Sequence, residues 1–405
     1  MSPKQRWLAC SLGVVCLRVP LPGQTWTESR VLELFSQQSP QALAARAQIA
    51  VTREELRGRA LYANPSFVYS REAAGYTEFF QGEVALPLSR RIGLLRQSVA
   101  PGVAAAEADA AASVWQLRVE VRLAFYHLLA HQAREAVLDD AARQLQDVIR
   151  ILEAREQEGE GSRYDRLRGQ REQVELATEK TAARAEAARA RSRLLEFLPA
   201  GTAVAGVEGV VEPAAPPPVL EELNAKALAA RAEFRAAAQR FERLVLEEKA
   251  AERLRYPEPV VAAGLKRADA GARTLSGPVV GVTVPIPWFN RGQQEVARLQ
   301  AERSQLEARR RALEHQVRAQ VTGAHESLRL KTDNLAAYRG RLGESGDELL
   351  RIAQTAYQEG EAGILELLDA LRLSRQSRLR RLELEMAVRE AHIELDRVVG
   401  EEVSR

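Results

Sequence analysis

The chain has 405 residues, a net charge of +3 and 5% aromatic residues, while 28% of its residues are charged. This composition is typical of long helices and coiled coils, and it argues against a set of compact globular domains. The small net charge gives no reason to expect binding to nucleic acid, since no basic face is interleaved with stacking aromatic residues.

The first predicted element is a secretory signal peptide over residues 1–24. A basic start precedes an apolar run over residues 7–17, and Pro and Gly residues follow it. Cys10 and Cys16 both lie in this segment, and neither has the context of a lipidation site. A processed chain would contain no thiol, which suits an exported protein. The alternative is a misplaced start codon or a disordered tail.

The chain contains an internal duplication. The sequence Ala-Leu-Ala-Ala-Arg-Ala occurs at Ala42–Ala47 and again at Ala227–Ala232. After each copy come a helical stretch, a break at a proline, two β-like runs, a long heptad helix, a Gly-centred turn and a second long helix. We therefore predict a tandem helix–strand–strand–helix–helix unit, with repeats over 25–199 and 219–405 and a Gly- and Pro-rich linker over 200–218.

The first repeat is expected to contain two strands, a long helix, a turn and a returning helix. Leu138, Leu145 and Leu152 follow one another at sevens, which predicts packing on partner helices. The returning helix carries a second such stripe at Leu167, Val174, Thr181, Ala188 and Leu195. The expected elements are strands over about 66–72 and 78–88, a helix over about 96–157 and a turn over about 158–164.

The second repeat follows the same order. Leu328, Leu335, Leu342 and Leu349 form the stripe of its long helix, and Leu379, Met386 and Ile393 form the stripe of its returning helix. A run of arginines in that returning helix (Arg372, Arg375, Arg378, Arg380 and Arg381) is expected to be a solvated face. The expected elements are strands over about 258–267 and 277–286, a helix over about 292–358 and a turn over about 359–365.

The β-like runs are the only candidates for a membrane-embedded part. Each is close to the ~9–11 residues of a tilted membrane strand, and no later stretch approaches the ~20 apolar residues of a spanning helix. Aromatic residues suited to the headgroup level accompany them, namely Tyr69, Phe79, Phe80, Trp288 and Phe289. Four strands cannot close a barrel, and open edges are not tolerated in lipid, so subunits would have to pool strands. The alternative is a pair of soluble hairpins that cap a helical stalk.

Two segments carry a resemblance to a known family. They are the second strand end with its following turn, Val284–Gly292, and the second helical turn, Tyr357–Ala370. With the duplication, they resemble the TolC family of outer-membrane efflux proteins over essentially the whole processed chain. The resemblance implies a mainly α fold with a small β part, in which duplicated helix-strand-strand-helix-helix units form a trimeric α-helical barrel plus a shared twelve-stranded outer-membrane β-barrel.

The resemblance also implies functional positions at the two helical turns. Acidic residues past the second turn line the closed periplasmic aperture in the family, and Glu366 and Asp369 occupy those positions here. Asp165 is the candidate in the first repeat. This sequence has Glu where the family often has Asp, and Ala362 where some members carry a basic residue. The alternative is that these acids are solvent-exposed residues at helix starts, where the positive end of the helix dipole favours negative charge.

The turns themselves are the expected contacts of a periplasmic adaptor protein. The candidate contacts are Gly159 and Ser162 in the first repeat and Gly360 and Gly363 in the second, and Ser162 and Asp165 match the family's turn. Gly363 replaces the Ser of the first copy. Details of any latch that holds the aperture closed are therefore left open by the sequence.

Residues for catalysis are not recognisable in the sequence. His127 and His131 sit four apart, but the run reads His-Leu-Leu-Ala-His and lacks the Glu of a zinc-protease motif. With no third ligand evident, packing or hydrogen bonding is the expected role of this pair. Neither a phosphate-binding glycine loop nor a nucleophile elbow is present. We predict no enzyme activity, no metal and no cofactor.

The predicted function is a passive outer-membrane exit duct of a tripartite efflux system. Its expected partners are two further copies of itself, a periplasmic adaptor, indirectly an inner-membrane pump, and outer-membrane lipid. The helical part would lie in the periplasm. The alternative is a soluble periplasmic scaffold or adaptor, which would have one helical hairpin and not two equivalent ones. The cargo (drug, metal ion or protein) is not legible, although short loops and a compact linker favour metal efflux weakly.

Overall fold

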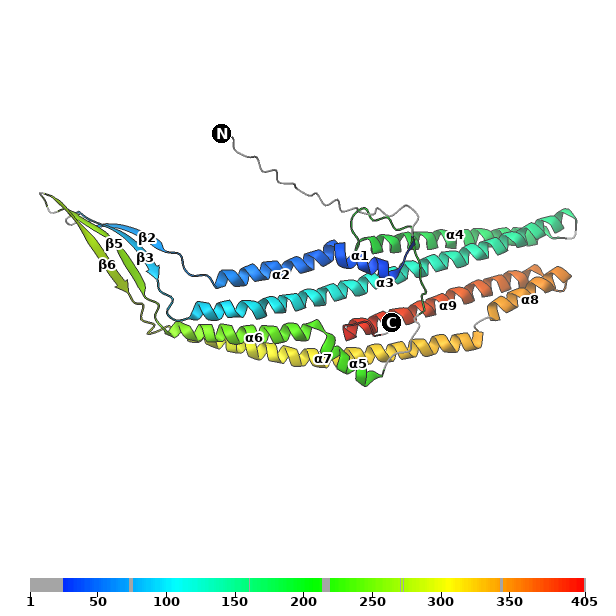
Figure 1. Ribbon diagram of the computed structural model, residues 1–405. Coiled ribbons are helices and arrows are strands. Elements are labelled where there is room, and N and C mark those ends of the chain that lie inside the picture. The colour runs from blue at the N-terminus through cyan, green and yellow to red at the C-terminus, as the bar shows by residue number, and fades with distance from the viewer. Residues whose placement is uncertain are drawn as a thin grey trace, which may run out of the picture.

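The computed structural model describes residues 25–72, 76–159, 161–212, 219–269, 271, 273–342 and 345–403. The predicted signal peptide, with both cysteines, and part of the predicted linker lie outside these residues. The described chain is a long rod with a β-sheet at one end and two helical turns at the other (Figure 1). It is mostly helical with a small β part, so the predicted fold class is confirmed at this level.

The helices follow the duplicated order expected from the sequence. They are α1 (Glu28–Gln38), α2 (Pro40–Arg59), α3 (Arg91–Gln157), α4 (Arg163–Leu195), α5 (Leu220–Ala230), α6 (Ala232–Glu252), α7 (Gln293–Leu342), α8 (Ser345–Glu359) and α9 (Ile364–Val399). At 1.5 Å per residue, α3 alone is about 100 Å long. Among the described helices, none is both long enough and apolar enough to cross a membrane.

The main sheet contains β2 (Ser66–Glu72), β3 (Thr77–Ala85), β5 (Val260–Asp269) and β6 (Thr274–Thr283), all antiparallel in the order β2-β3-β5-β6. β3 ends earlier than the expected 78–88, and β5 begins later than the expected 258–267. Prolines explain both limits, because Pro87 and Pro259 have no N–H to donate to a strand ladder. One further bond, from Leu86 N to Pro259 O (2.7 Å), extends the contact between the two repeats beyond the paired strands.

The helices form a layer whose composition changes along the rod. Near the sheet, α2 contacts α3, α3 contacts α6, and α6 contacts α7. Toward the two turns, α4 contacts α3, α3 contacts α9, and α9 contacts α8. Each half of the rod is thus four helices wide, and α3 runs through both halves (Figure 1). The outer helices come from different repeats: α2 and α4 from the first, α7 and α8 from the second.

The heptad prediction is confirmed for α3, where Leu138, Leu145 and Leu152 are all buried. In the second repeat the predicted helix over 292–358 is described as α7 up to Leu342 and as α8 from Ser345, and residues 343–344 between them lie outside the described residues. The buried seam moves by one residue from α7 to α8. Leu349 is 48% exposed, whereas Leu350 is 5% exposed and begins the new seam that Tyr357 continues at seven residues.

The stripe predicted for α4 faces away from the interior of the chain except at its last member, Leu195, which packs against the core. Leu167 and Val174 are 49% and 67% exposed, while Leu176, Ala183 and Leu194 are buried against α3. The sequence contains two apolar stripes on this helix, and only one can face α3, because α4 lies at the edge of the layer. In α9 the predicted stripe is confirmed, since Met386 and Ile393 are buried.

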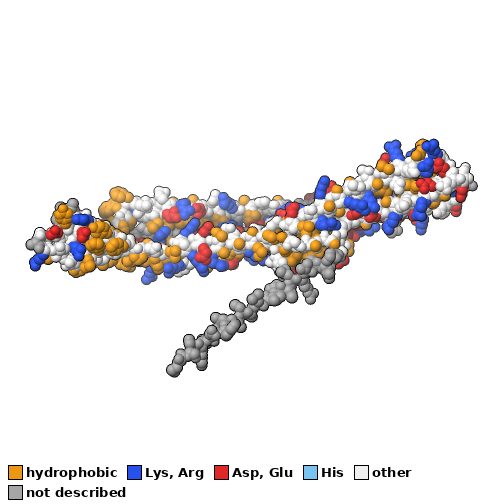
Figure 2. All heavy atoms as spheres, turned by 90° about the horizontal axis from the view of Figure 1, so that it is seen from above, with side chains coloured by type: hydrophobic (Ala, Val, Ile, Leu, Met, Phe, Trp, Pro, Cys, Tyr) orange, Lys and Arg blue, Asp and Glu red, His pale blue; other side chains and the backbone are white. Residues whose placement is uncertain are grey.

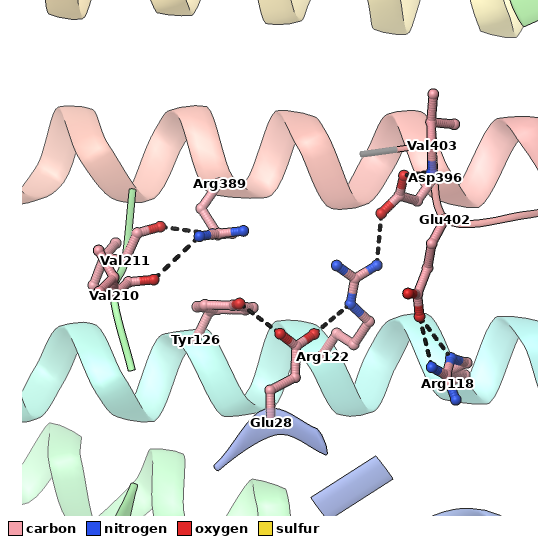
Figure 3. A network of polar contacts seen from close by, with 10 residues as sticks. All are labelled: Glu28, Arg118, Arg122, Tyr126, Val210, Val211, Arg389, Asp396, Glu402 and Val403. Carbon is pink, nitrogen blue, oxygen red and sulfur yellow. Dashed lines mark hydrogen bonds and ion pairs between the residues drawn. The ribbon is translucent and has the colours of Figure 1, made fainter. Parts of the chain in front are cut away.

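A polar network holds the middle of the rod together (Figure 3). The guanidinium of Arg122 on α3 donates from Nε to Glu28 Oε1 on α1 and from Nη1 to Asp396 Oδ2 on α9, both at 2.6 Å. Tyr126 donates its hydroxyl to the other oxygen of Glu28 at 2.6 Å. Arg122 is 6% exposed and Asp396 2% exposed, so three helices are joined by buried charged groups.

The segment that connects the two repeats also packs against the middle of the rod. β1 (Thr25–Trp26) pairs in parallel with β4 (Gly206–Val207), and Val207 N donates to Gln132 Oε1 on α3 at 3.0 Å. Arg389 on α9 donates to the carbonyls of Val210, Val211 and Glu212. Burial and the hydrogen bond to Glu28 raise the pKa of Tyr126 to about 12, and burial lowers that of His392 to about 4. Both groups are therefore neutral at pH 7.

Candidate functional site

The two helical turns lie together at the end of the rod away from the sheet (Figure 1). Each contains a glycine in the left-handed region, Gly159 with φ 82° and Gly360 with φ 79°. A residue with a Cβ is strained in this conformation, so glycine is the natural residue to end a helix there. The structure thus gives the two predicted turns the same local geometry, and both glycines are exposed.

The helix starts after the turns differ in their caps. Ser162 precedes α4 and accepts a hydrogen bond from Tyr164 N at 3.1 Å. Gly363 precedes α9 and has no side chain to do the same. The carboxylate of Glu366 occupies this space, since a Cβ built on Gly363 would lie 2.9 Å from Glu366 Oε2. Glu366 therefore sits at the favourable N-terminal end of the α9 dipole.

The three predicted aperture acids lie in two different hairpins. Glu366 and Asp369 are exposed within the first two turns of α9, while Asp165 is partly buried in the first turn of α4. The i, i+3 spacing places Glu366 and Asp369 on one side of α9. Within one chain the structure brings this pair together at the tip, and it leaves Asp165 on the neighbouring hairpin.

Between the hairpins lies a group of ion pairs that the sequence did not reveal. Arg372 on α9 donates from Nε to Glu172 Oε2 on α4 at 2.9 Å, and Arg375 lies 3.7 Å from the same carboxylate. Arg378 Nη1 lies 2.6 Å from Asp140 Oδ2 on α3. The expectation that this arginine run is a solvated face is therefore wrong for these three residues. Only spatial proximity of the hairpins identifies their partners, because Glu172 is 200 residues from Arg372 in sequence and Asp140 is 238 residues from Arg378.

Replacing Glu172 with Gln is expected to lower the free energy of unfolding by about 1–3 kcal/mol, because Glu172 is buried and binds two arginines of the other hairpin. The hydrogen bond from Arg372 lowers the pKa of Glu172. Its stabilisation is therefore complete above 4.5, the ordinary pKa of a glutamate, and is lost as the pH falls through the lower, folded-state pKa. Urea midpoints measured between pH 3 and 7 check this prediction.

The wild type should lose more stability than the Glu172→Gln variant as the solution is acidified, so that the two curves converge at low pH. Glu383→Gln serves as the control, because Glu383 forms an exposed pair with Arg380 on its own helix. That substitution should change stability by less than about 1 kcal/mol. Parallel curves for wild type and Glu172→Gln would show that this carboxylate does not join the hairpins.

The main sheet has one apolar face. Tyr69 lies opposite Phe80, and Phe80 lies opposite Leu265, so the three side chains share this face. The Tyr69 and Phe80 rings are 5.1 Å apart between centroids. Further members of this face are Phe67, Val84, Val261, Ala263, Val280 and Val282. Many are exposed, with Phe67 at 72% and Val280 at 73%. Figure 2 shows apolar side chains gathering toward this end of the rod.

The opposite face of the sheet is mostly polar or small. It carries Ser66, Ser70, Gln81, Glu83, Gly264, Lys266 and Gly281, together with Val68, Phe79 and Val279. Phe79 therefore does not join Tyr69 and Phe80, and Lys266 Nζ lies 5.4 Å from its ring centroid. Trp288 and Phe289 lie beyond β6, before α7, and are 71% and 90% exposed. The five predicted aromatics thus fall in three separate places.

The histidine pair lies on α3, beside α9. His127 Nε2 is 3.5 Å from Glu390 Oε1. Both histidines line a groove of about 230 Å³ that Glu383, Met386 and Glu390 of α9 complete. Within the described part of the chain, no group of three or more His, Cys, Asp or Glu side chains is arranged to hold a metal ion.

A family model matches the second half of the chain. Residues 223–401 match the family model described as outer membrane efflux protein. The chain is also 27% identical over 308 residues to the cobalt-zinc-cadmium resistance protein CzcC of Cupriavidus metallidurans, a match that covers 73% of this chain and 70% of CzcC. The resemblance to the TolC family of efflux proteins is confirmed by these matches.

Comparison with solved structures extends the similarity to nearly the whole chain. The open-state MtrE outer membrane channel of Neisseria gonorrhoeae has a TM-score of 0.69 at 15% identity, over 93% of this chain and 90% of MtrE. The outer membrane protein VceC of Vibrio cholerae has a TM-score of 0.69 at 15% identity, over 92% and 96% of the two chains. At these identities the likeness concerns the fold.

Proposed function

We propose that this chain, a member of the outer membrane efflux protein family, is the outer-membrane exit duct of a tripartite efflux system. It conducts substrates passively from a periplasmic adaptor and an inner-membrane pump to the outside. Proteins of this family are channels, and the driving force comes from the pump. The alternative of a soluble scaffold is disfavoured because the sheet exposes a continuous apolar face.

The observation that carries the proposal is the pair of open edges along the whole rod. The sheet has β2 and β6 at its edges, the helices near it have α2 and α7, and those near the turns have α4 and α8. At each level one edge belongs to the first repeat and the other to the second. A monomer with two different complementary edges forms a closed ring when copies join edge to edge with a rotation that closes.

The exposed apolar stripes support this joining. Leu167 and Val174 on α4 are exposed on one edge of the layer, and Leu349 and Ile352 on α8 are exposed on the other. Packed between neighbouring copies, the two stripes remove apolar surface from water. The exposed residues of the stripe at sevens on α4 would then pack on a partner helix, as a heptad repeat predicts.

Three copies would contribute four strands each to a twelve-stranded barrel and their helices to one tube, as the family resemblance implies. The apolar face of the sheet would contact lipid, and the polar and small face would line the lumen. Arg71, Glu78 and Arg267 lie at the far end of the apolar face, beside the strand turns, where charged groups can reach water. The barrel would lie in the outer membrane and the helical tube in the periplasm.

The tip of the tube would hold the aperture and the adaptor contacts. Glu366 and Asp369 from three copies form a ring of carboxylates around the axis, with Asp165 close by on the neighbouring hairpin. Such a ring attracts cations, and its mutual repulsion favours opening. The exposed turns at Gly159, Ser162, Gly360 and Gly363 are the surfaces that the adaptor would meet.

The proposed cargo is a divalent metal cation. The relative found by sequence, CzcC, is named for cobalt, zinc and cadmium resistance, and the match covers most of both chains. An acidic aperture suits a cationic cargo.

The function is tested with the purified, detergent-extracted protein in planar bilayers. Native mass spectrometry should give three chains per particle, and the wild type should show a small, cation-selective conductance. The double variant Glu366→Ala/Asp369→Ala should lose cation selectivity or change in conductance, because the carboxylate ring is gone. A protein that stays soluble without detergent and never inserts would show that the scaffold alternative is correct.

The matched control is the double variant Glu314→Ala/Asp333→Ala, which removes two acids from the exposed surface of α7, away from the tip. Its conductance should equal that of the wild type. If both double variants change selectivity equally, the effect is one of overall charge and the aperture assignment fails.

A further inference from the structure

We propose that His127 and His131 form a binding site for a divalent transition-metal cation on the inner face of the duct. The site consists of two imidazoles in the groove between α3 and α9. The placement on the inner face rests on the proposed function, whereas the binding of the cation does not. The site would give a metal cargo a point of contact on its way along the tube.

The backbone places both imidazoles over one surface patch. Residues four apart on a helix lie on the same side, with Cβ atoms about 5–6 Å apart, which is a spacing that one metal ion can bridge. The groove that they line is large enough for an ion with bound water, at about 230 Å³. Imidazole nitrogen is a favoured ligand of Zn²⁺, Co²⁺ and Cu²⁺.

The charges around the groove favour a cation. Glu390 lies 3.5 Å from His127, and Glu383 lines the same groove. The one arginine in the groove, Arg134, lies 3.6 Å from Glu179 Oε1, which offsets its positive charge. An unprotonated imidazole offers a nitrogen lone pair to a metal.

The two histidines lie on the side of α3 opposite the side that contacts the segment with β4. Gln132 binds Val207 N, and Phe125 and Leu129 lie against Gly209. His127 and His131 are each two residues from Leu129, which is about 200° around the helix. Because α1, β1 and β4 would obstruct the lumen if they faced it, we assign them to the outside and the two histidines to the inside.

Two protein ligands suit transport better than storage. Structural zinc sites use four protein ligands and hold the metal firmly, while open sites leave positions for water. A two-imidazole site with water in the remaining positions binds a cation reversibly. It is also compatible with the lack of any larger ligand cluster in the described residues.

The test is calorimetric titration of ZnCl₂ into the full chain, purified in detergent without a polyhistidine tag. The wild type should bind one Zn²⁺ per chain, and His127→Gln/His131→Gln should weaken binding at least about tenfold. The control His315→Gln/His325→Gln removes two imidazoles that are ten residues apart on α7, about 15 Å along the helix, too far for one ion. This control should bind as the wild type does.

Absence of binding by the wild type, or equal loss in both double variants, would overturn the site. Thermal midpoints establish that each variant is folded, and the single variant His131→Gln should weaken binding on its own. Planar-bilayer conductance separates the two proposals. A channel that conducts but does not bind Zn²⁺ contradicts only the metal site, whereas a protein that binds Zn²⁺ but never inserts contradicts only the duct.

Discussion

Replacing Arg122 with Ala is expected to lower the free energy of unfolding by about 3–5 kcal/mol. The variant leaves the carboxylates of Glu28 and Asp396 without their shared guanidinium partner, and Asp396 is 2% exposed. Burial already raises the pKa of Asp396, so the uncompensated carboxyl would take up a proton more readily still. The measurement is the denaturant midpoint followed by the helical circular-dichroism signal.

The control for this prediction is Arg30→Ala. Arg30 pairs with Glu33 on α1 with both side chains more than half exposed, and such pairs contribute less than about 1 kcal/mol. If both variants unfold at the same denaturant concentration, the network in Figure 3 does not hold the three helices together. The expected unfolding begins with α1, since Arg122 and Tyr126 are its charged and polar anchors on α3.

Replacing Gly264 with Ala is expected to prevent correct pairing of β3 with β5. A Cβ at this position would lie 1.9 Å from Phe80 O and 2.7 Å from Gln81 Cα, both backbone atoms of the neighbouring strand. A clash with backbone atoms cannot be relieved by a change of side-chain rotamer, so the two strands must separate. The expected cost is about 3 kcal/mol or more per chain. In the proposed barrel this pair joins the two repeats, and its loss affects every copy.

The readout is the yield of detergent-extracted trimer and its thermal midpoint. The matched control is Gly277→Ala, on the same face of the sheet but with nothing within 4 Å of its added Cβ. The control should assemble normally. Normal assembly of Gly264→Ala would show that β3 and β5 can shift apart without loss of the sheet.

Much of the local structure was predictable because it depends on short-range patterns. Glycines at 159 and 360 mark the turns, since few other residues adopt a positive φ easily. Leucines at sevens in α3 identify a buried seam. The shift of the buried seam between α7 and α8 was not predictable in this way, because the leucine stripe continues in sequence while the buried seam moves by one residue.

Contacts between the repeats could not be read from the sequence. The arginines of α9 resemble any solvated helix face until Glu172 and Asp140 are seen opposite them. Strand register likewise decides which aromatic residues share a face. Phe79 and Phe80 are neighbours in sequence, and the pleat sends their side chains to opposite faces.

The sequence by itself determined the duplication, the long helices, the turns and the order of elements, because periodicity and backbone preference act over a few residues. Only the tertiary structure decided which face of each element is free. It shows that each level of the rod ends in one edge from each repeat, and that α4 exposes the apolar residues Leu167 and Val174 among the described residues. Burial is a property of neighbours in space, and Arg122 and Asp396, which are such neighbours, are 274 residues apart in sequence.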